Sequence, residues 1–425
     1  MSLPPIGLHD LALSIPQRRM SLQQLASVRI SADPALEKHL VRALSSTGQE
    51  AMRFPALWQD TVTMAAEAMR ELLIQRADLP LDHLRFLTMG TETSVDMSKA
   101  GSSYVLGLLQ SAGWKLPTSL STFQVQQACA GGSLALLTVG SFIQAAGRDD
   151  DLAIVLTSDI ARYKAPSTAE VTQGAGATAL LLRKNPDLLE FDLAGVGFAS
   201  RDVDDFFRPL GSTIAKVRGG YSLACYHQAL FEAFEDHCHR ANVKPDEELR
   251  SIDAFYFHVP YAHMPVAAIE KLLEKHLGFD SSQVKDFLAE RGFSAGLDAV
   301  TEIGNLYTGG LYLSLAFGLR ERIQAWGSKS TGKKVLLASY GSGNTMAVWT
   351  ARVAPQAAQT VARWPLDKIK KLAVDAPFAQ YQEWIDREFS YETYPGLLLK
   401  DPPESGAFAL GAIREDGYRE YRLVP

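Results

Sequence analysis

Residues 124–147, QVQQACAGGSLALLTVGSFIQAAG, decide the fold because they combine a strand end, a tight turn and a buried helix. A polar run gives way to Cys129, then to two glycines and an apolar segment of helical length. Apolar side chains occupy nearly every side of that helix, so we expect it to lie inside the protein, with Cys129 in its first turn. The positive end of the helix dipole and its unpaired N–H groups would stabilise a thiolate there. This placement suits a nucleophile, and the alternative is a small buried apolar residue.

Length and composition indicate a large globular chain. At 425 residues it exceeds the usual size of one hydrophobic core, so we expect two domains or two halves of one fold. The formal net charge of −6 argues against a nucleic-acid or anionic-membrane partner. No uninterrupted apolar run of about 18 residues predicts a membrane span. Cys129, Cys225 and Cys238 are too scattered for a disulfide framework, and the N-terminus does not read as a signal peptide, so a reducing cytoplasm is the expected location.

Strands and helices alternate through the first part of the chain. The pattern predicts strands at 84–89, 121–126 and 151–159, an amphipathic helix at 59–77 and a further helix at 98–114. Such alternation is typical of an α/β sheet with helices on its faces.

The second part repeats this plan. Residues 252–258 are predicted to form a strand that ends at His258. The stretch 303–325 is polar, then glycine-rich, then helical, much like the segment around Cys129. A further strand at 334–340 opens into a Gly-Ser-Gly turn. This repetition predicts an internal duplication.

The duplication suggests a division of the chain. Residues 1–190 form the half with the nucleophile, 191–350 the half with the histidine and asparagine, and 351–425 a C-terminal extension. We expect that extension to be a surface appendage with a charged amphipathic helix near 366–391.

Four polar residues fall at strand ends or helix starts, where the active sites of such sheets lie: Glu92, Cys129, His258 and Asn305. A cysteine nucleophile needs a base, which His258 can supply, and a buried carboxylate such as Glu92 can move protons. The turn at 341–343 can offer a backbone N–H to an oxyanion beside the N–H of Cys129. Each residue also has an ordinary structural explanation, as a helix-terminal charge, a core histidine or a turn former.

We predict no metal and no organic cofactor. His237, Cys238 and His239 are neighbours on a predicted helix, so their side chains point to different faces and cannot share a metal. The glycine-rich run at 174–179 lacks the helix that follows a dinucleotide-binding loop.

Several motifs in a fixed order make the sequence resemble the 3-hydroxy-3-methylglutaryl-CoA (HMG-CoA) synthases of the thiolase superfamily, over about residues 5–350. The motifs are GTETSVDMSKA (90–100), QACAGG (127–132), SDIARY (158–163), TQGAGA (172–177), DDFFRP (204–209), GGYSLACY (219–226), FHVPY (257–261), IGNLYTGGLY (303–312) and SYGSG (339–343). The related β-ketoacyl synthases lack the glutamate of GTET, so Glu92 separates the two groups. The resemblance implies a thiolase-like α/β fold of two duplicated βαβ-type halves in α/β/α/β/α layers, normally a homodimer.

The resemblance also implies the mechanism of an HMG-CoA synthase-type acyltransferase. Cys129 takes an acetyl group from a thioester, and Glu92 removes a proton from its methyl group. The carbon nucleophile adds to the β-ketone of a β-ketoacyl thioester that His258 and Asn305 hold and polarise. Glu92 then protonates the alkoxide, and water frees the product from Cys129. Further matches are the pocket-shaping positions Asp96, Asp159, Asp205, Tyr163, Phe206, Tyr307 and Tyr340, and the substrate-contact positions Thr172, Ser222 and Ser342.

Departures from the family pattern bear on the acyl donor and its carrier. Ala130 stands where the family usually has tyrosine, so we expect a larger acetyl pocket that accepts propionyl or longer donors. Ala51, His263 and Ala267 stand where CoA-using relatives carry lysines that bind the CoA phosphates. An acyl-carrier protein delivers phosphopantetheine without the nucleotide. The resemblance therefore favours the polyketide β-branching subclass, which acts on carrier-bound β-ketoacyl chains.

Two other functions stay open at this point. The first is a mevalonate-pathway HMG-CoA synthase that uses acetyl-CoA and acetoacetyl-CoA. The second is a non-catalytic binding partner with a thiolase fold, against which the intact set of catalytic residues argues. Arg29, near the expected entrance, is either a phosphate contact or a solvated surface arginine.

Overall fold

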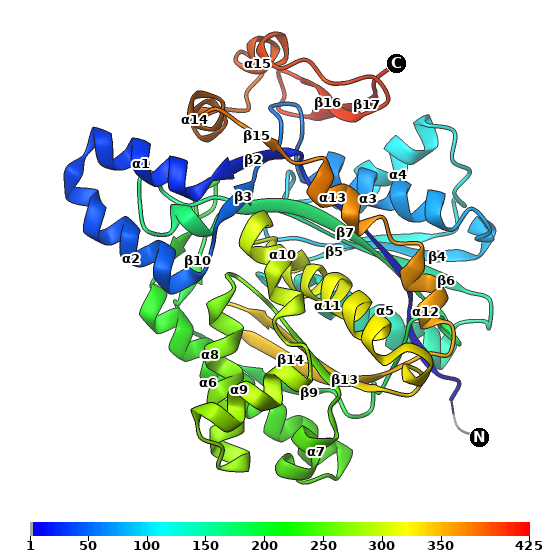
Figure 1. Cartoon of the computed structure of the whole chain (residues 1–425). Coiled ribbons are helices and arrows are strands. Elements are labelled where there is room, and N and C mark those ends of the chain that lie inside the picture. Colours follow the sequence, from blue (N-terminus) through cyan, green and yellow to red (C-terminus); the bar gives the residue numbers. More distant parts are fainter. Residues whose placement is uncertain (1–2) are drawn as a thin grey trace.

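The computed structural model describes residues 3–425, and these form a mixed α/β structure around a large sheet (Figure 1). Within these residues, ten strands join in one ladder of order β12-β13-β14-β8-β1-β7-β6-β4-β5, and β9 pairs with β14. The strands are β1 (Ile6–Ser14), β4 (Leu84–Gly90), β5 (Ser121–Val125), β6 (Leu152–Ala161), β7 (Gly174–Lys184), β8 (Leu189–Phe191), β9 (Gly197–Ser200), β12 (Ala254–Phe257), β13 (Lys334–Gly341) and β14 (Thr345–Val353). β8 links the strands of the two chain halves into this single ladder.

Helices cover the strands in layers, as the α/β/α/β/α prediction requires. α3 (Thr61–Gln75) and α4 (Gly101–Ser111) pack on the outer face of the N-terminal strands. α6 (Gly219–Ala241) covers the outer face of the C-terminal strands, and α8 (His263–Leu277) packs beside it. α5 (Gly131–Ala146) and α11 (Gly310–Trp326) lie between the two sets of strands (Figure 1). The predicted fold class is confirmed.

Side chains of β6 alternate between two hydrophobic cores, which explains why residues 152–156 of this strand are continuously apolar. Val155 faces the inner core, which also contains the buried residues of α5. Its neighbours Ile154 and Leu156 face the outer core formed with α3. Because successive side chains of a strand point to opposite faces, a strand between two helical layers buries apolar residues on both of its faces.

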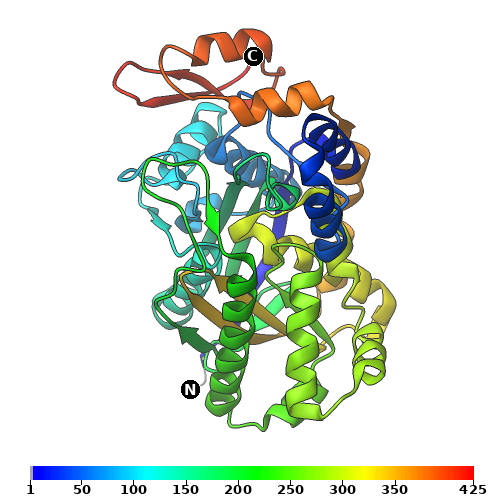
Figure 2. The same ribbon diagram turned by 90° about the vertical axis from the view of Figure 1, so that its left-hand side faces the viewer.

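The remaining elements lie outside the central layers. They are α1 (Leu22–Ala32), α2 (Glu37–Thr47), α7 (Pro245–Ser251), α9 (Ser281–Glu290), α10 (Ala295–Ile303), α12 (Ala357–Ala362), α13 (Leu366–Lys371), α14 (Phe378–Asp386) and α15 (Tyr394–Lys400), the small sheet of β2 (Arg18–Ser21), β3 (Ala51–Arg53) and β15 (Val374–Asp375), and the hairpins β10 (Phe206–Phe207) with β11 (Lys216–Val217) and β16 (Phe408–Ile413) with β17 (Arg419–Leu423). Figure 2 shows β16, β17 and α15 as a cap at one end of the molecule.

The single helix predicted near 366–391 is wrong. The chain forms α13, the short strand β15 and then α14 in this region. Pro377 precedes α14, and proline has no N–H to continue a helix through this point. The expectation of a surface appendage also needs correction, because Tyr381 and Trp384 of α14 are fully buried in the outer core of the N-terminal half.

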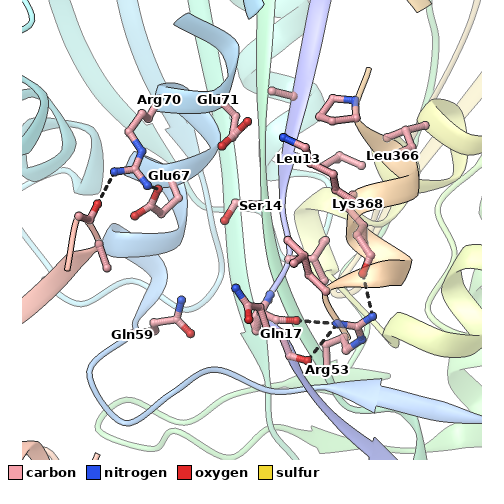
Figure 3. A pocket seen from close by; sticks show the side chains of 18 of the residues that line it. Leu13, Ser14, Gln17, Arg53, Gln59, Glu67, Arg70, Glu71, Leu366 and Lys368 are labelled. Atoms are coloured by element: carbon pink, nitrogen blue, oxygen red, sulfur yellow. Dashed lines mark hydrogen bonds and ion pairs between the residues drawn. The ribbon is translucent and has the colours of Figure 1, made fainter. Parts of the chain in front are cut away.

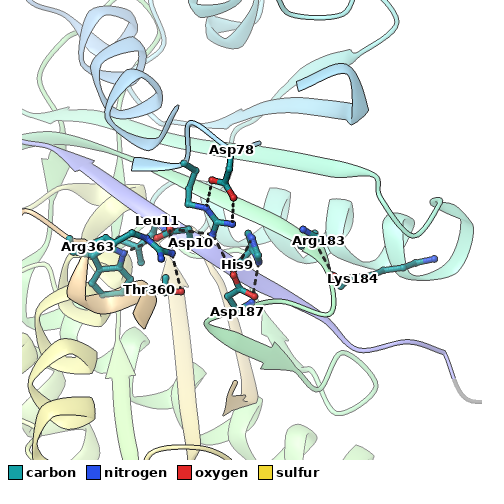
Figure 4. Close-up of polar contacts among 11 residues, drawn as sticks. His9, Asp10, Leu11, Asp78, Arg183, Lys184, Asp187, Thr360 and Arg363 are labelled. Atoms are coloured by element: carbon teal, nitrogen blue, oxygen red, sulfur yellow. Dashed lines mark hydrogen bonds and ion pairs between the residues drawn. The ribbon is translucent and has the colours of Figure 1, made fainter. Parts of the chain in front are cut away.

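A buried polar network also ties the start of the chain to its C-terminal part (Figure 4). Asp10 is fully buried, and its carboxylate accepts hydrogen bonds from Leu11 N and from Trp364 Nε1, both at 2.8 Å. The guanidinium groups of Arg363 and Arg76 lie 3.5 and 3.6 Å from the same carboxylate. Because a buried carboxylate is costly without such partners, this network holds residues 363–364 against β1.

The stretch 128–146, which contains α5, is long and apolar enough to cross a membrane by length and composition alone. Most of it is buried against the strands instead, as expected for a core helix. The division of the chain at residues 190 and 350 stays a prediction, and β14 runs through the second of these points as one continuous strand.

Candidate active site

Cys129 lies in a tight turn between β5 and α5. Ala128 before it has a φ of 42°, in the left-handed region, and the N–H of Ala130 donates to Gln127 O at 3.0 Å. α5 begins at Gly131, two residues later than predicted, because the N–H groups of Ala130 and Gly131 are used inside this turn. A left-handed alanine is strained, and such strain persists at functional sites where the surroundings hold it.

Two glycines allow neighbouring strand ends to approach this turn. A Cβ atom at Gly90, the end of β4, would lie 2.2 Å from the backbone nitrogen of Gly132. A Cβ atom at Gly341, the end of β13, would lie 2.3 Å from Gln127 O. Only glycine leaves room for these contacts. The ends of β4 and β13, from opposite halves of the chain, therefore meet at Cys129.

The thiol of Cys129 donates a hydrogen bond to Glu92 Oε1 at 3.2 Å. Burial raises the pKa of Glu92 to about 8, and the nearby Arg208 guanidinium opposes this rise only in part. At neutral pH most of the Glu92 carboxyl is therefore protonated, and the ionised fraction is a strong enough base for proton transfer. The contact between Cys129 and Glu92 is the central feature of the site.

The expected thiolate is not what the structure supports. Burial raises the pKa of the Cys129 thiol well above its usual value, and the neighbouring Glu92 raises it further. Desolvation disfavours the charged form, and here it outweighs the dipole of α5. Cys129 therefore rests as a thiol, and a role as nucleophile would require it to lose its proton during the attack.

Asp159 organises the segments that carry Glu92 and Thr308. One carboxylate oxygen accepts hydrogen bonds from Glu92 N at 3.0 Å and from Thr93 Oγ1 at 2.6 Å, together with Thr91 Oγ1 and Thr93 N. The other oxygen accepts from the backbone N–H and the hydroxyl of Thr308. Asp159 lies inside β6 rather than at its end and is fully buried, so it positions Glu92 instead of meeting substrate.

We expect Asp159→Asn to destabilise the protein by about 3 kcal/mol, because an amide NH₂ would then face groups that are themselves donors. Urea denaturation measures this loss. Thr91→Val removes a single donor from the same carboxylate and should cost about 1 kcal/mol. Equal losses for the two variants would contradict the view that Asp159 holds both segments.

Aromatic rings enclose the thiol. Tyr163, Phe206 and Tyr307 pack edge to face with ring centres 5.8 to 6.5 Å apart, and they form one buried cluster with Cys129. Such a cluster excludes water and strengthens the electrostatic interactions inside it. These three predicted pocket residues therefore lie around the Cys129 thiol.

Asp205 joins a second group of predicted residues. Its carboxylate accepts hydrogen bonds from Ser222 Oγ at 3.0 Å, Tyr340 OH at 2.9 Å and Gly343 N at 2.9 Å. This network holds the end of β13 beside the Cys129 turn. Within the 341–343 turn, the N–H of Gly343 is bonded to Asp205 and is therefore not available to an oxyanion.

His258 and Asn305 lie at the N-terminal side of α11. A Cβ atom at Gly310 would lie 3.1 Å from His258 Nδ1, so the ring packs against the start of this helix. Burial lowers the pKa of His258 to about 3, and the imidazole is therefore neutral at pH 7. The side-chain oxygen of Asn305 accepts from Tyr307 N at 2.8 Å, which leaves its amide nitrogen as the group that can donate to a substrate.

Two other predicted site residues form hydrogen bonds within their own loops. Asp96 accepts from Ser98 N and Lys99 N, both at 2.8 Å, and so closes its own loop. Thr172 Oγ1 donates to Ala169 O at 2.9 Å, within the same short turn. Ser342 lies between Gly341, which closely approaches Gln127, and Gly343, whose N–H donates to Asp205.

Arg29 is not the solvated surface arginine of one of its two sequence interpretations. Its guanidinium donates to the buried carboxylate of Glu170 at 2.7 Å and lies 5.0 Å from the ring centre of Phe378. This arginine is therefore paired inside the fold rather than solvated at an entrance.

Two residues that contact the site were not singled out from the sequence. Arg208 donates through Nη1 to the carbonyl oxygen of Glu92, and Thr308 bonds to Asp159. Both stand inside motifs of the family pattern, DDFFRP and IGNLYTGGLY, but only the tertiary structure shows what they contact.

A cavity of ≈ 300 Å³ lies elsewhere, between β1, α3 and residues 364–372 (Figure 3). Arg53, Glu67 and Lys368 are among its lining residues. No predicted site residue lines it. His237 also has a structural explanation, because it is buried and bonded to Glu248 at 3.0 Å, and residues 3–425 contain no cluster of side chains suited to a metal ion.

Comparison with known families identifies two matching sequence models. The one described as "Hydroxymethylglutaryl-coenzyme A synthase N terminal" matches residues 38–187. The one described as "Hydroxymethylglutaryl-coenzyme A synthase C terminal" matches residues 268–383. Together they span most of the elements that build the site.

Individual relatives agree with the family models. The hydroxymethylglutaryl-CoA synthase of Enterococcus faecalis is 29% identical over 348 residues, which cover 82% of this chain and 83% of that protein. A solved structure of MvaS in complex with 3-hydroxy-3-methylglutaryl coenzyme A superposes with a TM-score of 0.84 at 29% identity, over 100% of both chains. The HMG synthase of the curacin biosynthetic pathway, solved in complex with a holo donor acyl-carrier protein, has a TM-score of 0.82 at 22% identity, over 99% of this chain and 100% of that one. The last likeness concerns the fold alone.

Proposed function

Because this chain belongs to the hydroxymethylglutaryl-CoA synthase family of acyltransferases, we propose that it joins an acetyl group on Cys129 to the β-ketone of a chain carried by an acyl-carrier protein. The observation that carries the chemistry is the 3.2 Å contact between the Cys129 thiol and Glu92, whose pKa is raised to about 8. One residue supplies the nucleophile and the other a carboxyl group that can both take and give a proton near neutral pH.

The proposed reaction uses these two residues in turn. The thiol sulfur of Cys129 attacks the acetyl thioester while its proton passes to ionised Glu92, which returns it to the departing carrier thiolate. Glu92 then removes a proton from the acetyl methyl group, and the carbon formed adds to the β-ketone. The neutral imidazole of His258 and the amide of Asn305 donate to that ketone oxygen. Glu92 protonates the alkoxide, and hydrolysis frees Cys129.

The choice of a carrier protein over free CoA rests on three positions where a fixed positive charge is missing. Ala51 is fully buried in β3, and Ala267 lies in α8. The ring of His263 packs against Gly48, and its Nδ1 lies 3.2 Å from Ser46 O. The 3′-phosphate and diphosphate of CoA bind best where the enzyme supplies positive charge. A phosphopantetheine arm is instead attached to its carrier protein, and contacts between that protein and the enzyme surface can hold it in place.

Intact-protein mass spectrometry tests this choice. We expect Cys129 to be acetylated at least tenfold faster by an acetylated carrier protein than by acetyl-CoA, with Cys129→Ala as the unreactive control. The double variant His263→Lys, Ala267→Lys is the matched probe, and it should gain acetylation from CoA without losing that from the carrier. Efficient acetylation of the wild type by CoA would instead support a mevalonate-type enzyme.

That second candidate is favoured by the likeness to the Enterococcus faecalis synthase and to MvaS. The proposal of a non-catalytic binding partner is disfavoured, because a partner has no need of a thiol hydrogen-bonded to a carboxyl of raised pKa. If neither acetyl-CoA nor the acetylated carrier protein places an acetyl group on Cys129, the non-catalytic binding partner becomes the favoured function.

We also propose that Ala130 widens donor choice. It directly follows the nucleophile and is fully buried. A pocket that rejects one added methylene discriminates by roughly 10- to 200-fold. We expect this enzyme to load propionyl within about tenfold of acetyl, and we expect Ala130→Val to restore the preference for acetyl. A wild-type preference as strong as that of Ala130→Val would contradict the prediction.

A homodimer is the proposed assembly. β5 ends the ladder of the described residues, so one edge of this strand has no strand paired to it. Phe123 of β5 and the exposed Phe142 both pack edge to face against Phe86, with ring centres 6.5 and 5.1 Å from that of Phe86. An open edge with adjacent apolar surface is a natural place for a second copy. Sedimentation should give twice the chain mass, and a monomer at micromolar concentration would contradict this.

The proposed location is the cytoplasm. Cys129, Cys225 and Cys238 are all free thiols in the fold. Free thiols persist where the surroundings are reducing. Imaging of a fluorescent fusion in the producing cell tests the location, and signal outside the cytoplasm would overturn it.

A further inference from the structure

Arg208 is anchored in the wall of the active site by one of its nitrogens. Nη1 donates to the carbonyl oxygen of Glu92. The guanidinium carbon lies 5.6 Å from the ring centre of Tyr307 and 6.0 Å from that of Phe206, two of the rings that enclose Cys129. These contacts fix the plane of the guanidinium beside the reacting groups.

The other two nitrogens of Arg208 have no protein partner. Nε and Nη2 are buried and donate no hydrogen bond to any group of residues 3–425. Buried donors without partners cost free energy, so a native site that keeps them is built for a ligand or for water. Nε and Nη2 also form one edge of the planar guanidinium, and such an edge matches the two oxygens of a carboxylate.

We propose that the Nε/Nη2 edge of Arg208 binds the product carboxylate released when the condensed acyl chain is hydrolysed from Cys129. This inference rests on the proposed function. In that step the oxygen of water bonds to the acyl carbon and the carbon–sulfur bond breaks. One proton of the water returns to the sulfur and the other leaves, so that a carboxylate and the free thiol remain. The reaction therefore creates an anion beside Cys129, where none of the substrates had one.

Binding there also affects the rate of the step. Negative charge develops on the acyl oxygen as water adds, and a preorganised guanidinium stabilises this charge more than it stabilises the neutral thioester. The Arg208 charge is close enough to matter, since it lowers the pKa of both Glu92 and Cys129 against the effect of burial. Arg208 would thus favour hydrolysis over return of the acyl chain to a carrier.

Competitive inhibition by two analogues tests the carboxylate contact without turnover. The probes are the hydroxymethylglutaryl thioester of pantetheine and its carboxamide, which has the same shape and no charge. We expect wild type to bind the carboxylate about 10- to 100-fold more tightly than the amide, as for hydrogen bonds to a charged group. Arg208→Met should remove this preference. Arg208→Lys should keep a preference of a few-fold, because lysine retains the positive charge but cannot form two parallel hydrogen bonds to a carboxylate.

The acyl groups that accumulate on Cys129 provide a second test. In Arg208→Met we expect mass spectrometry to show Cys129 acetylated as in wild type, followed by accumulation of the condensed acyl adduct. Arg201→Met is the matched control, because Arg201 is exposed and pairs with Glu232 outside the site. Thermal unfolding and Cys129 acetylation verify that each variant is folded.

The outcomes are distinct. An undiminished preference for the carboxylate in Arg208→Met would overturn the inference, as would hydrolysis at the wild-type rate. Equal weakening of carboxylate and amide binding would assign Arg208 only the role of anchoring Glu92, and would also overturn it. Failure of the proposed function would instead appear in wild type, as the absence of any acyl group on Cys129.

Discussion

The Cys129→Ser enzyme is expected to take up no acetyl group from any thioester, and its turnover should fall by about 10⁴- to 10⁶-fold. Cys129 is held as a neutral thiol, whose pKa burial raises well above its usual value. A serine hydroxyl in the same place is a far weaker acid and has no stronger base beside it than Glu92. Intact mass after exposure to acetylated carrier measures the loss directly.

Cys225→Ser is the matched control for this variant. Cys225 is also buried and free, but it lies in α6 outside the thiol–carboxyl contact. This control should acetylate as wild type does. Full acetylation of the Cys129→Ser chain at another residue would show that the nucleophile has been misassigned.

Glu92→Gln is expected to separate the two halves of the reaction. An amide resembles the protonated carboxyl that Glu92 carries at neutral pH, and it can still accept the thiol hydrogen bond. Acetylation should therefore slow but reach completion. Removal of a proton from the acetyl methyl group has no such substitute, so condensation should fall by a further 10²- to 10⁴-fold, roughly the size of one general-base contribution.

The pH dependence provides the accompanying measurement. Because burial raises the Glu92 pKa from 4.5 to about 8, the carboxylate fraction grows as pH rises through that value. We expect the condensation rate of acetylated enzyme to increase up to about pH 8 and then to level off. Glu92→Gln should show a flat profile over the same range. A wild-type condensation rate that does not change between about pH 6 and pH 8, roughly the two units below that pKa, would contradict the role of Glu92 as base.

Much of the fold follows from local sequence patterns. The periodic helix at 59–77 and the strands at 84–89, 121–126 and 334–340 are all present, because their apolar spacing depends on near neighbours. The C-terminal part was harder to predict. Tyr381 and Trp384 are buried by residues far away in the chain, and no sequence pattern within 351–425 predicts this burial.

The sequence by itself determined the family and the layered α/β plan, and it singled out Cys129 and Glu92 as candidates for a nucleophile and its carboxyl partner, since motifs and periodicity are properties of short stretches. Only the tertiary structure decided the protonation of Cys129 and Glu92 and the partners of Asp159 and Arg208. Charge states depend on burial and on which distant groups come within a few ångströms. Those distances are set when the two halves of the chain close on one another, where the ends of β4 and β13 meet at the Cys129 turn.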